Sequence, residues 1–134
     1  MKTHRLRGLA SEYAFAAQYY SLVVDEKDSL IQPTLDTGWD FMVASTGVRI
    51  QVKRFTQKTN QNKWNLDLRR KRNKGTGNYD GTEFDFLAIH DWEYKLNESN
   101  DFIITHVSNL IEDGKMKQSV GIKDLSNQGF ESLL

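Results

Sequence analysis

Apolar residues near the start of the chain recur at helical intervals, in a segment rich in alanine. The recurring positions are Leu9, Tyr13, Ala16, Ala17 and Tyr20. Spacings of three and four residues place side chains on one face of an α-helix, and alanine has the highest helix propensity of all residues. We therefore expect a helix over residues 8–22, with Glu12 in its second turn.

The remainder of the chain consists of short apolar runs separated by polar turns, a pattern typical of β-strands. The expected strands cover residues 29–33, 39–44, 48–55, 64–68, 84–90, 102–104 and 119–122. A short helix capped by Ser108 is expected over residues 108–112, and residues 125–134 form a tail with some helical character. One helix followed by several strands favours an α/β or α+β domain with a mixed central sheet. The helix would cover one face of that sheet, and the hairpin 39–55 would lie near its centre.

Two polar segments interrupt this pattern. Residues 56–63 consist mainly of Gln, Lys, Thr and Asn and are expected to form a mobile loop. Residues 69–79 have the composition of a loop that is disordered or that becomes ordered on binding a ligand.

The composition limits the class of protein. The length of 134 residues and the single proline favour one domain over residues 1–134. There is no cysteine, so disulfides and thiolate metal sites are excluded. No apolar run is long enough to span a membrane, and the basic N-terminus lacks the apolar region of a signal peptide. We expect a cytoplasmic location and no membrane partner.

Charge is distributed unevenly along a chain that is neutral overall. Residues 49–74 contain ten lysines and arginines and a single acid, Asp67. The acids that balance this excess lie elsewhere, many of them in residues 75–134. A basic block in an otherwise acidic molecule creates a field that steers a polyanion to one face. A solvated basic loop is the alternative interpretation.

The hairpin carries the candidate chemistry. Asp40 lies in its first strand, Gln51 and Lys53 lie in its second, and residues 45–47 form the turn. Alternation along a strand points Gln51 and Lys53 to one face and Val52 to the other. One acid, one amide and one amine would therefore meet on adjacent strands.

Such a group suits hydrolysis of a phosphodiester, which needs a hard cation on the phosphate and a water to attack it. Mg²⁺ prefers oxygen ligands, so Asp40 would be its main ligand, with Glu12 as a second carboxylate. The Gln51 amide and the Val52 carbonyl would add neutral oxygens, and Mn²⁺ is expected to substitute for Mg²⁺. Lys53 would hold the water and offset charge in the transition state. Taken singly, Glu12 and Lys53 are also compatible with solvated surface positions, and Asp40 with a turn cap.

The arrangement of Glu12, Asp40 and the triplet Gln51-Val52-Lys53 resembles the PD-(D/E)XK nuclease superfamily, which has the restriction-endonuclease-like fold. The run from Pro33 to Asp40 looks especially like small bacterial and phage members, which include homing endonucleases and Holliday-junction-resolvase-like enzymes. The resemblance implies a mixed sheet flanked by helices, and a catalytic set of Glu12, Asp40, Gln51 and Lys53. Two positions depart from the usual motif, since Trp39 stands where the family has proline and Gln51 where it has Asp or Glu.

The expected function is a Mg²⁺-dependent, site-specific endonuclease of homing type that cuts double-stranded DNA. The basic residues expected to contact DNA are Arg54, Lys58, Lys63, Arg69, Arg70, Lys71, Arg72 and Lys74. One chain carries one site, so cutting both strands calls for a homodimer or homotetramer.

Three alternatives remain open at this point. A junction resolvase would use the same chemistry but would recognise DNA shape. A catalytically silent nucleic-acid-binding module would explain Gln51, although Asp40 and Lys53 argue against it. An interaction protein would use the acidic half, residues 75–134, to bind a partner.

Overall fold

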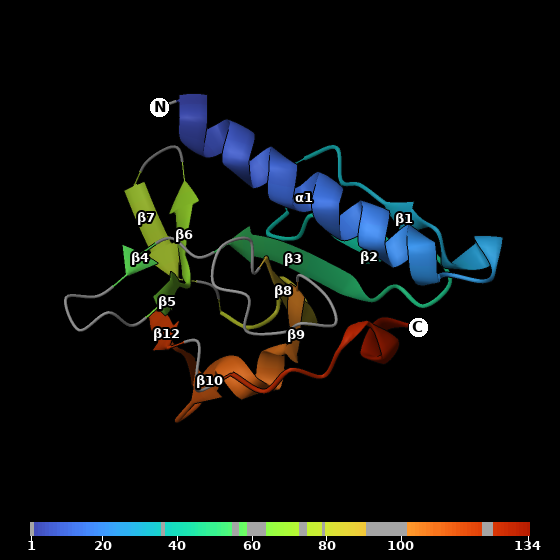
Figure 1. Cartoon of the computed structure of the whole chain (residues 1–134). Coiled ribbons are helices and arrows are strands. Elements are labelled where there is room, and N and C mark those ends of the chain that lie inside the picture. The colour runs from blue at the N-terminus through green and yellow to red at the C-terminus, as the bar shows by residue number, and fades with distance from the viewer. Residues whose placement is uncertain are drawn as a thin grey trace.

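A mixed five-stranded sheet lies at the centre of the structure, with one long helix packed along it (Figure 1). The structure is a computed structural model, and it describes residues 2–35, 37–54, 57–58, 64–72, 75–78, 80–90, 102–121 and 125–134. The helix is α1 (Lys2–Leu22). In spatial order the strands are β1 (Leu30–Ile31), β2 (Phe41–Val43), β3 (Arg49–Arg54), β8 (Phe86–His90) and β9 (Phe102–His106). Strands β3 and β8 are parallel, and the other neighbours are antiparallel.

Helix α1 begins earlier than the sequence indicated and buries a different face. Ser11, Phe15 and Tyr19, spaced by four residues, are buried, whereas Tyr13 is 66% exposed. The Phe15 ring packs between the sheet and the C-terminal tail, with its centroid 5.5–5.6 Å from those of Phe41, Phe102 and Phe130. The face was misassigned because both sides of the helix carry aromatic residues, and Phe15 and Tyr19 fill the core in place of Tyr13 and Tyr20. The earlier start of α1 also moves Glu12 beyond the second turn.

The hairpin β2–β3 forms as predicted. The Val43 N–H donates to the Val48 carbonyl at 2.8 Å, and the Gly47 N–H donates back to the Val43 carbonyl at 2.8 Å. Gly47 has a φ of 75°, a conformation that glycine adopts without steric cost. The glycine therefore closes the turn and fixes the register, which pairs Phe41 with Ile50.

The sheet carries a hydrophobic core on each face. On the side of α1, Ile50, Val52 and Ile104 pack against Phe15. On the opposite side, Leu87 and Ile103 pack against residues of a second, smaller sheet and of the segment that follows β9. The smaller sheet has the order β12 (Ser119–Gly121), β5 (Trp64–Asp67) and β4 (Gln57–Lys58). A short hairpin joins β10 (Ile111–Glu112) to β11 (Lys115–Met116).

The two segments expected to be loops contain strands. Strand β4 lies in residues 56–63, and the rest of that segment falls outside the described residues. Residues 69–79 contain an antiparallel pair, β6 (Arg69–Arg72) and β7 (Gly75–Asn78). Every basic residue of β6 lies opposite a small uncharged residue: the partners are Asn78, Gly77, Thr76 and Gly75. The expectation of a loop was therefore wrong for β6 and β7, because this register avoids like-charge pairs across the ladder.

The C-terminal region also differs in part from expectation. The helix expected over residues 108–112 is a 3₁₀ turn over Val107–Leu110, and its cap is the His106 side chain, which accepts from the Ser108 N–H at 3.1 Å. The tail ends in a further 3₁₀ turn over Phe130–Leu133, whose Phe130 is buried under α1. Within the described part of the chain, no helix has both the length and the apolar character that crossing a membrane would need.

Candidate metal and catalytic site

Asp40 is fixed at the start of β2 by two contacts with β3. Its backbone N–H donates to the Ile50 carbonyl at 2.8 Å, and its carboxylate oxygen Oδ2 accepts from the Val52 N–H at 2.8 Å. The side chain is partly buried. The hairpin thus holds the Asp40 carboxyl beside Val52 in the middle of β3, where Gln51 and Lys53 are the neighbouring residues.

Helix α1 brings Glu12 to the same point. The Glu12 and Asp40 side chains are hydrogen-bonded to one another. Burial raises the pKa of Asp40 to about 7, and the charge of Glu12 adds to this rise, while the Val52 N–H and the Lys53 charge oppose it. Burial also raises the pKa of Glu12 above its usual value, and the hydrogen bond to Asp40 acts in the opposite direction. Two partly buried acids in contact resist carrying two negative charges, so near neutral pH they hold a proton between them.

Gln51, Val52 and Lys53 complete the group. The Gln51 amide Nε2 lies 3.4 Å from the Val52 carbonyl oxygen. The nitrogen and oxygen of the Gln51 amide occupy equivalent positions. A 180° rotation of the amide group would therefore place the Gln51 oxygen, in place of Nε2, beside the Val52 carbonyl. The Val52 side chain points into the core beneath α1, so only its backbone can take part in the site. The charge of Lys53 is close enough to act on the pKa of Asp40.

The donor set fits a hard divalent cation. Two carboxylates in contact and two neutral oxygens match the ligands that Mg²⁺ takes in proteins, with water and substrate phosphate completing the shell. A cation would also relieve the repulsion between Glu12 and Asp40. Among the residues that the structure describes, no three His, Cys, Asp or Glu side chains gather in one place.

The residues expected to contact DNA are spread over several strands and do not form one group as the site residues do. Arg54 is partly buried at the end of β3, next to Lys53. Lys58 lies in β4, and Arg69, Arg70, Lys71 and Arg72 form β6. Lys63 and Lys74 lie outside the described residues. Figure 1 shows β4 and the β6–β7 pair on the same side of the view as the N-terminal end of α1.

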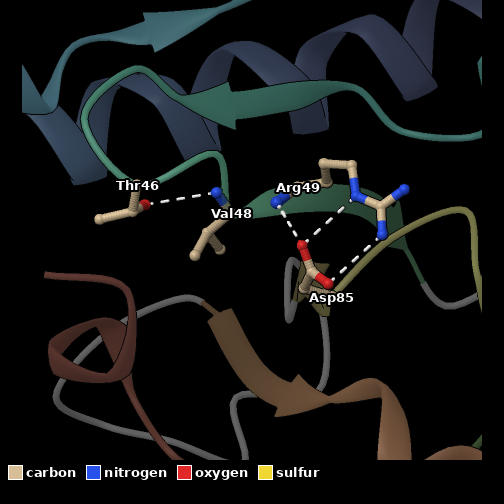
Figure 2. A network of polar contacts seen from close by, with 4 residues as sticks. All are labelled: Thr46, Val48, Arg49 and Asp85. Carbon is tan, nitrogen blue, oxygen red and sulfur yellow. Dashed lines mark hydrogen bonds and ion pairs between the residues drawn. The ribbon is translucent and has the colours of Figure 1, made fainter.

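One ion pair near the site was not foreseen from the sequence. Asp85 accepts from the Arg49 backbone N–H at 2.9 Å and lies 3.4 Å from the Arg49 guanidinium (Figure 2). Its own N–H donates to the Arg49 carbonyl at 2.9 Å. Burial favours a higher pKa for Asp85, but the contacts with Arg49 outweigh it and hold the pKa below its usual value. The Arg49 side chain therefore links β3 to the residue that precedes β8.

A second polar contact also lacked a sequence signal. The Ser11 hydroxyl lies 2.8 Å from His90 Nδ1, and the His90 ring stacks on Phe102 with centroids 4.7 Å apart. Ser11 is almost fully buried. This contact ties α1 to the end of β8 one residue away from Glu12, and so helps to position the helix over the site.

Comparison of the sequence with models of known families and with curated proteins finds no match. Comparison of the structures does. The fold is similar to that of a bacterial homing endonuclease, I-Ssp6803I, with a TM-score of 0.61 over 88% of this chain and 76% of the other, at 18% sequence identity. The fold is restriction-endonuclease-like. This confirms the predicted fold class, and the mixed sheet with α1 packed on it is the part of that fold that assembles Glu12, Asp40 and Lys53.

Proposed function

We propose that the protein is a metal-dependent endonuclease that hydrolyses phosphodiester bonds in double-stranded DNA. The observation that carries the proposal is the contact between the Glu12 and Asp40 carboxyls, fixed beside Lys53 on β3. Its setting in a fold similar to that of a homing endonuclease supports the same conclusion. A structural role explains such a pair poorly, because placing two acids together in a partly buried site destabilises the folded chain.

Each residue has a role that follows from its position. Asp40 and Glu12, once free of their shared proton, would hold Mg²⁺ or Mn²⁺, and the Gln51 amide and the Val52 carbonyl would supply neutral oxygens. When bound, the metal polarises the scissile phosphate and lowers the pKa of a nearby water. Lys53 orients the attacking water and offsets the negative charge that develops on the phosphate. The Val52 N–H donates to Asp40 Oδ2 and so holds this carboxyl in place beside Glu12.

Gln51 makes this site less negative than a site with a third acid. A neutral amide binds a cation more weakly than a carboxylate does, so affinity for Mg²⁺ should be low without DNA and should rise when a phosphate joins the ligand set. The proposal therefore includes mutual dependence of metal and DNA binding. The neutral Gln51 also favours the second candidate function, a nucleic-acid-binding module that does not cleave DNA.

The basic pair β6–β7 is the proposed DNA-contacting element. Strand β6 consists only of arginine and lysine, and its partner β7 consists of glycine, threonine and asparagine. A two-stranded ribbon of this kind fits the major groove of B-DNA, whereas phosphate contacts need only the positive charge. We propose that Arg69, Arg70, Lys71 and Arg72 contact DNA, and that Arg54, Lys58, Lys63 and Lys74 extend this contact along the backbone.

A cleavage assay tests the enzymatic proposal. Wild-type protein is incubated with Mg²⁺ and supercoiled plasmid, linear genomic DNA or a synthetic four-way junction, beside Asp40→Asn, Lys53→Ala and the surface control Glu112→Gln. Discrete duplex products that Glu112→Gln retains and the two site variants lose are expected. Cutting of the junction alone would favour a resolvase, and binding without cutting of any substrate would favour the silent module.

Salt dependence of binding tests the DNA-contacting element separately. The triple variant Arg69→Ala, Arg70→Ala and Arg72→Ala should bind DNA more weakly at low salt. It should also reduce the slope of log affinity against log salt concentration by about 3, since each lost phosphate contact removes roughly 0.9. Fluorescence anisotropy with a labelled duplex, in Ca²⁺ or without metal, measures both quantities. An unchanged slope would assign the DNA surface to another part of the chain.

A further inference from the structure

Helix α1 is apolar on two opposite sides. Its inner side carries Phe15 and Tyr19 into the core. Its outer side carries a second apolar series of exposed residues: Leu6, Ala10, Tyr13, Ala17, Tyr20 and, just past the end of the helix, Val24. Between Arg7 and Asp25 the only charged residue is Glu12, which belongs to the candidate site. An apolar stripe on a helix normally packs against another surface, so the outer stripe of α1 calls for a partner as the inner one does.

The outer series has the spacing of a helix–helix seam. Its members are separated alternately by four and three residues, which is the heptad pattern of a and d positions in coiled coils. Leu6 is 63% exposed, Tyr13 66% and Val24 100%. Two copies of the series facing each other would bury on the order of 1,000 Å², which reaches the lower range of specific interfaces.

We propose that this outer face of α1 pairs antiparallel with the same face of a second copy of the chain. The pattern is self-complementary in that orientation. With the two helices centred on Phe15, Tyr13 lies opposite Ala17 of the partner subunit, Tyr20 lies opposite Ala10 of the partner subunit, and Leu6 lies opposite Val24 of the partner subunit. Each large side chain thus meets a small or medium one, as knobs-into-holes packing requires, and the contact closes under a two-fold axis.

The charges at the two ends of α1 support the antiparallel orientation. The first turn contains no acid and the last turn contains no base, which is the reverse of what stabilises a single helix through its dipole. Arg5 and Arg7 are exposed near the N-terminal end, and Asp25 and Glu26 are exposed just beyond the C-terminal end. Antiparallel pairing brings the basic end of one copy beside the acidic end of the other. Charges that oppose the helix dipole within one chain would therefore attract the opposite charges of the second copy.

Tyr20 shows that part of this face is already ordered. Its hydroxyl accepts the Leu30 N–H at 2.9 Å, while half of the residue remains exposed. A ring held by its hydroxyl loses little freedom when a partner covers it, so the cost of binding is reduced. The interface would also set the distance between two candidate sites, because Glu12 lies on the same helix as the seam.

Sedimentation velocity across a range of protein concentrations tests the proposal without reference to nuclease activity. The wild-type chain should sediment as a dimer. Tyr13→Glu, which places a charge in the seam, should raise the dissociation constant at least about tenfold. Leu35→Glu places the same charge at a residue that is 77% exposed and lies off the helix, so it should leave the dimer intact. Circular dichroism confirms that both variants fold.

A charge exchange tests the orientation. Arg5→Glu and Glu26→Arg should each weaken the dimer, and the double variant should restore it, since the two residues meet only between antiparallel copies. A wild-type chain that is monomeric at all concentrations would overturn the proposal. So would a dimer that is insensitive to Tyr13→Glu, and a failure of the double variant to recover would overturn the antiparallel arrangement.

Discussion

Asp40 and Asp85 make the same backbone contacts with β3, and their carboxylates differ in the second partner. Asp40 accepts the Val52 N–H at 2.8 Å, and Asp85 accepts the Arg49 N–H at 2.9 Å. Both N–H groups belong to β3. The backbone therefore offers each carboxylate one equivalent hydrogen bond, and the difference lies in the second partner.

That second partner decides whether the acid stabilises the fold. Asp85 faces the Arg49 guanidinium, and its pKa lies below the usual value despite burial. Asp40 faces another acid, Glu12, and burial raises its pKa to about 7. A group with a depressed pKa stabilises the folded state in its charged form, whereas a group with a raised pKa opposes it. An acid kept at a cost to stability is a strong candidate for function.

The largest expected effect is on activity. Asp40→Asn should lower the rate of DNA cleavage by a factor on the order of 100–1,000 or more, because it removes the principal anionic ligand and the charge facing the phosphate. Asp85→Asn makes the same chemical change at the structural aspartate and should leave cleavage within a few-fold of wild type. Initial rates on a fixed duplex at saturating Mg²⁺ measure both. Equal losses in the two variants would break the distinction between the two aspartates.

The next effect concerns the pH dependence of stability without metal. The folded chain holds protons on Glu12 and Asp40 that the unfolded chain releases near pH 4, so unfolding free energy should fall as pH rises from about 4 toward 7. Asp40→Asn should remove most of this dependence and stabilise the chain at pH 8 by about 1–4 kcal/mol. Urea denaturation with EDTA, at pH 5 and at pH 8, measures the change. Added Mg²⁺ should then stabilise the wild type more than Asp40→Asn.

Asp85→Asn should change the unfolding free energy in the opposite direction and by a smaller amount. The pKa of Asp85 is depressed, so its contribution is present above pH 4 and is lost as pH falls. The pair with Arg49 is about a third exposed, which reduces its value through solvent screening. We expect destabilisation of about 1 kcal/mol at pH 7 that vanishes below pH 4. A stabilising effect at pH 7 in urea denaturation would contradict the structural role.

The smallest effect is expected at Gln51. Gln51→Glu would add a third acid to the group and should lower the Mg²⁺ concentration needed for half-maximal cleavage several-fold, because a carboxylate binds the cation more tightly than an amide does. The added charge should also raise the pKa of Asp40 further and reduce stability without metal. A Mg²⁺ titration of the cleavage rate and a melting curve in EDTA separate the two effects. No change in either would place Gln51 outside the site.

The hairpin 39–55 and the segment 69–79 show where the local sequence pattern is enough to predict structure and where it is not. The hairpin 39–55 has clear apolar runs and a glycine turn, so its register and the proximity of Asp40 to the triplet followed from the chain itself. The segment 69–79 has low strand propensity, yet β6 pairs with β7 in a register that places each of its basic residues opposite a small one. Asp85 lies 36 residues from Arg49 along the chain, and a local sequence pattern does not predict a contact over that separation.

The sequence by itself determined the fold class, and it supplied the residues that we propose for the site. Periodicity, turn chemistry and the order of Glu12, Asp40, Gln51 and Lys53 are local properties of the chain, and they indicated the helix, the hairpin and their chemistry. Only the tertiary structure decided which face of α1 is buried, that Glu12 meets Asp40, and that Arg49 belongs to Asp85. These outcomes depend on which side chains far apart in the chain fill the same space, and on the burial that sets each charge.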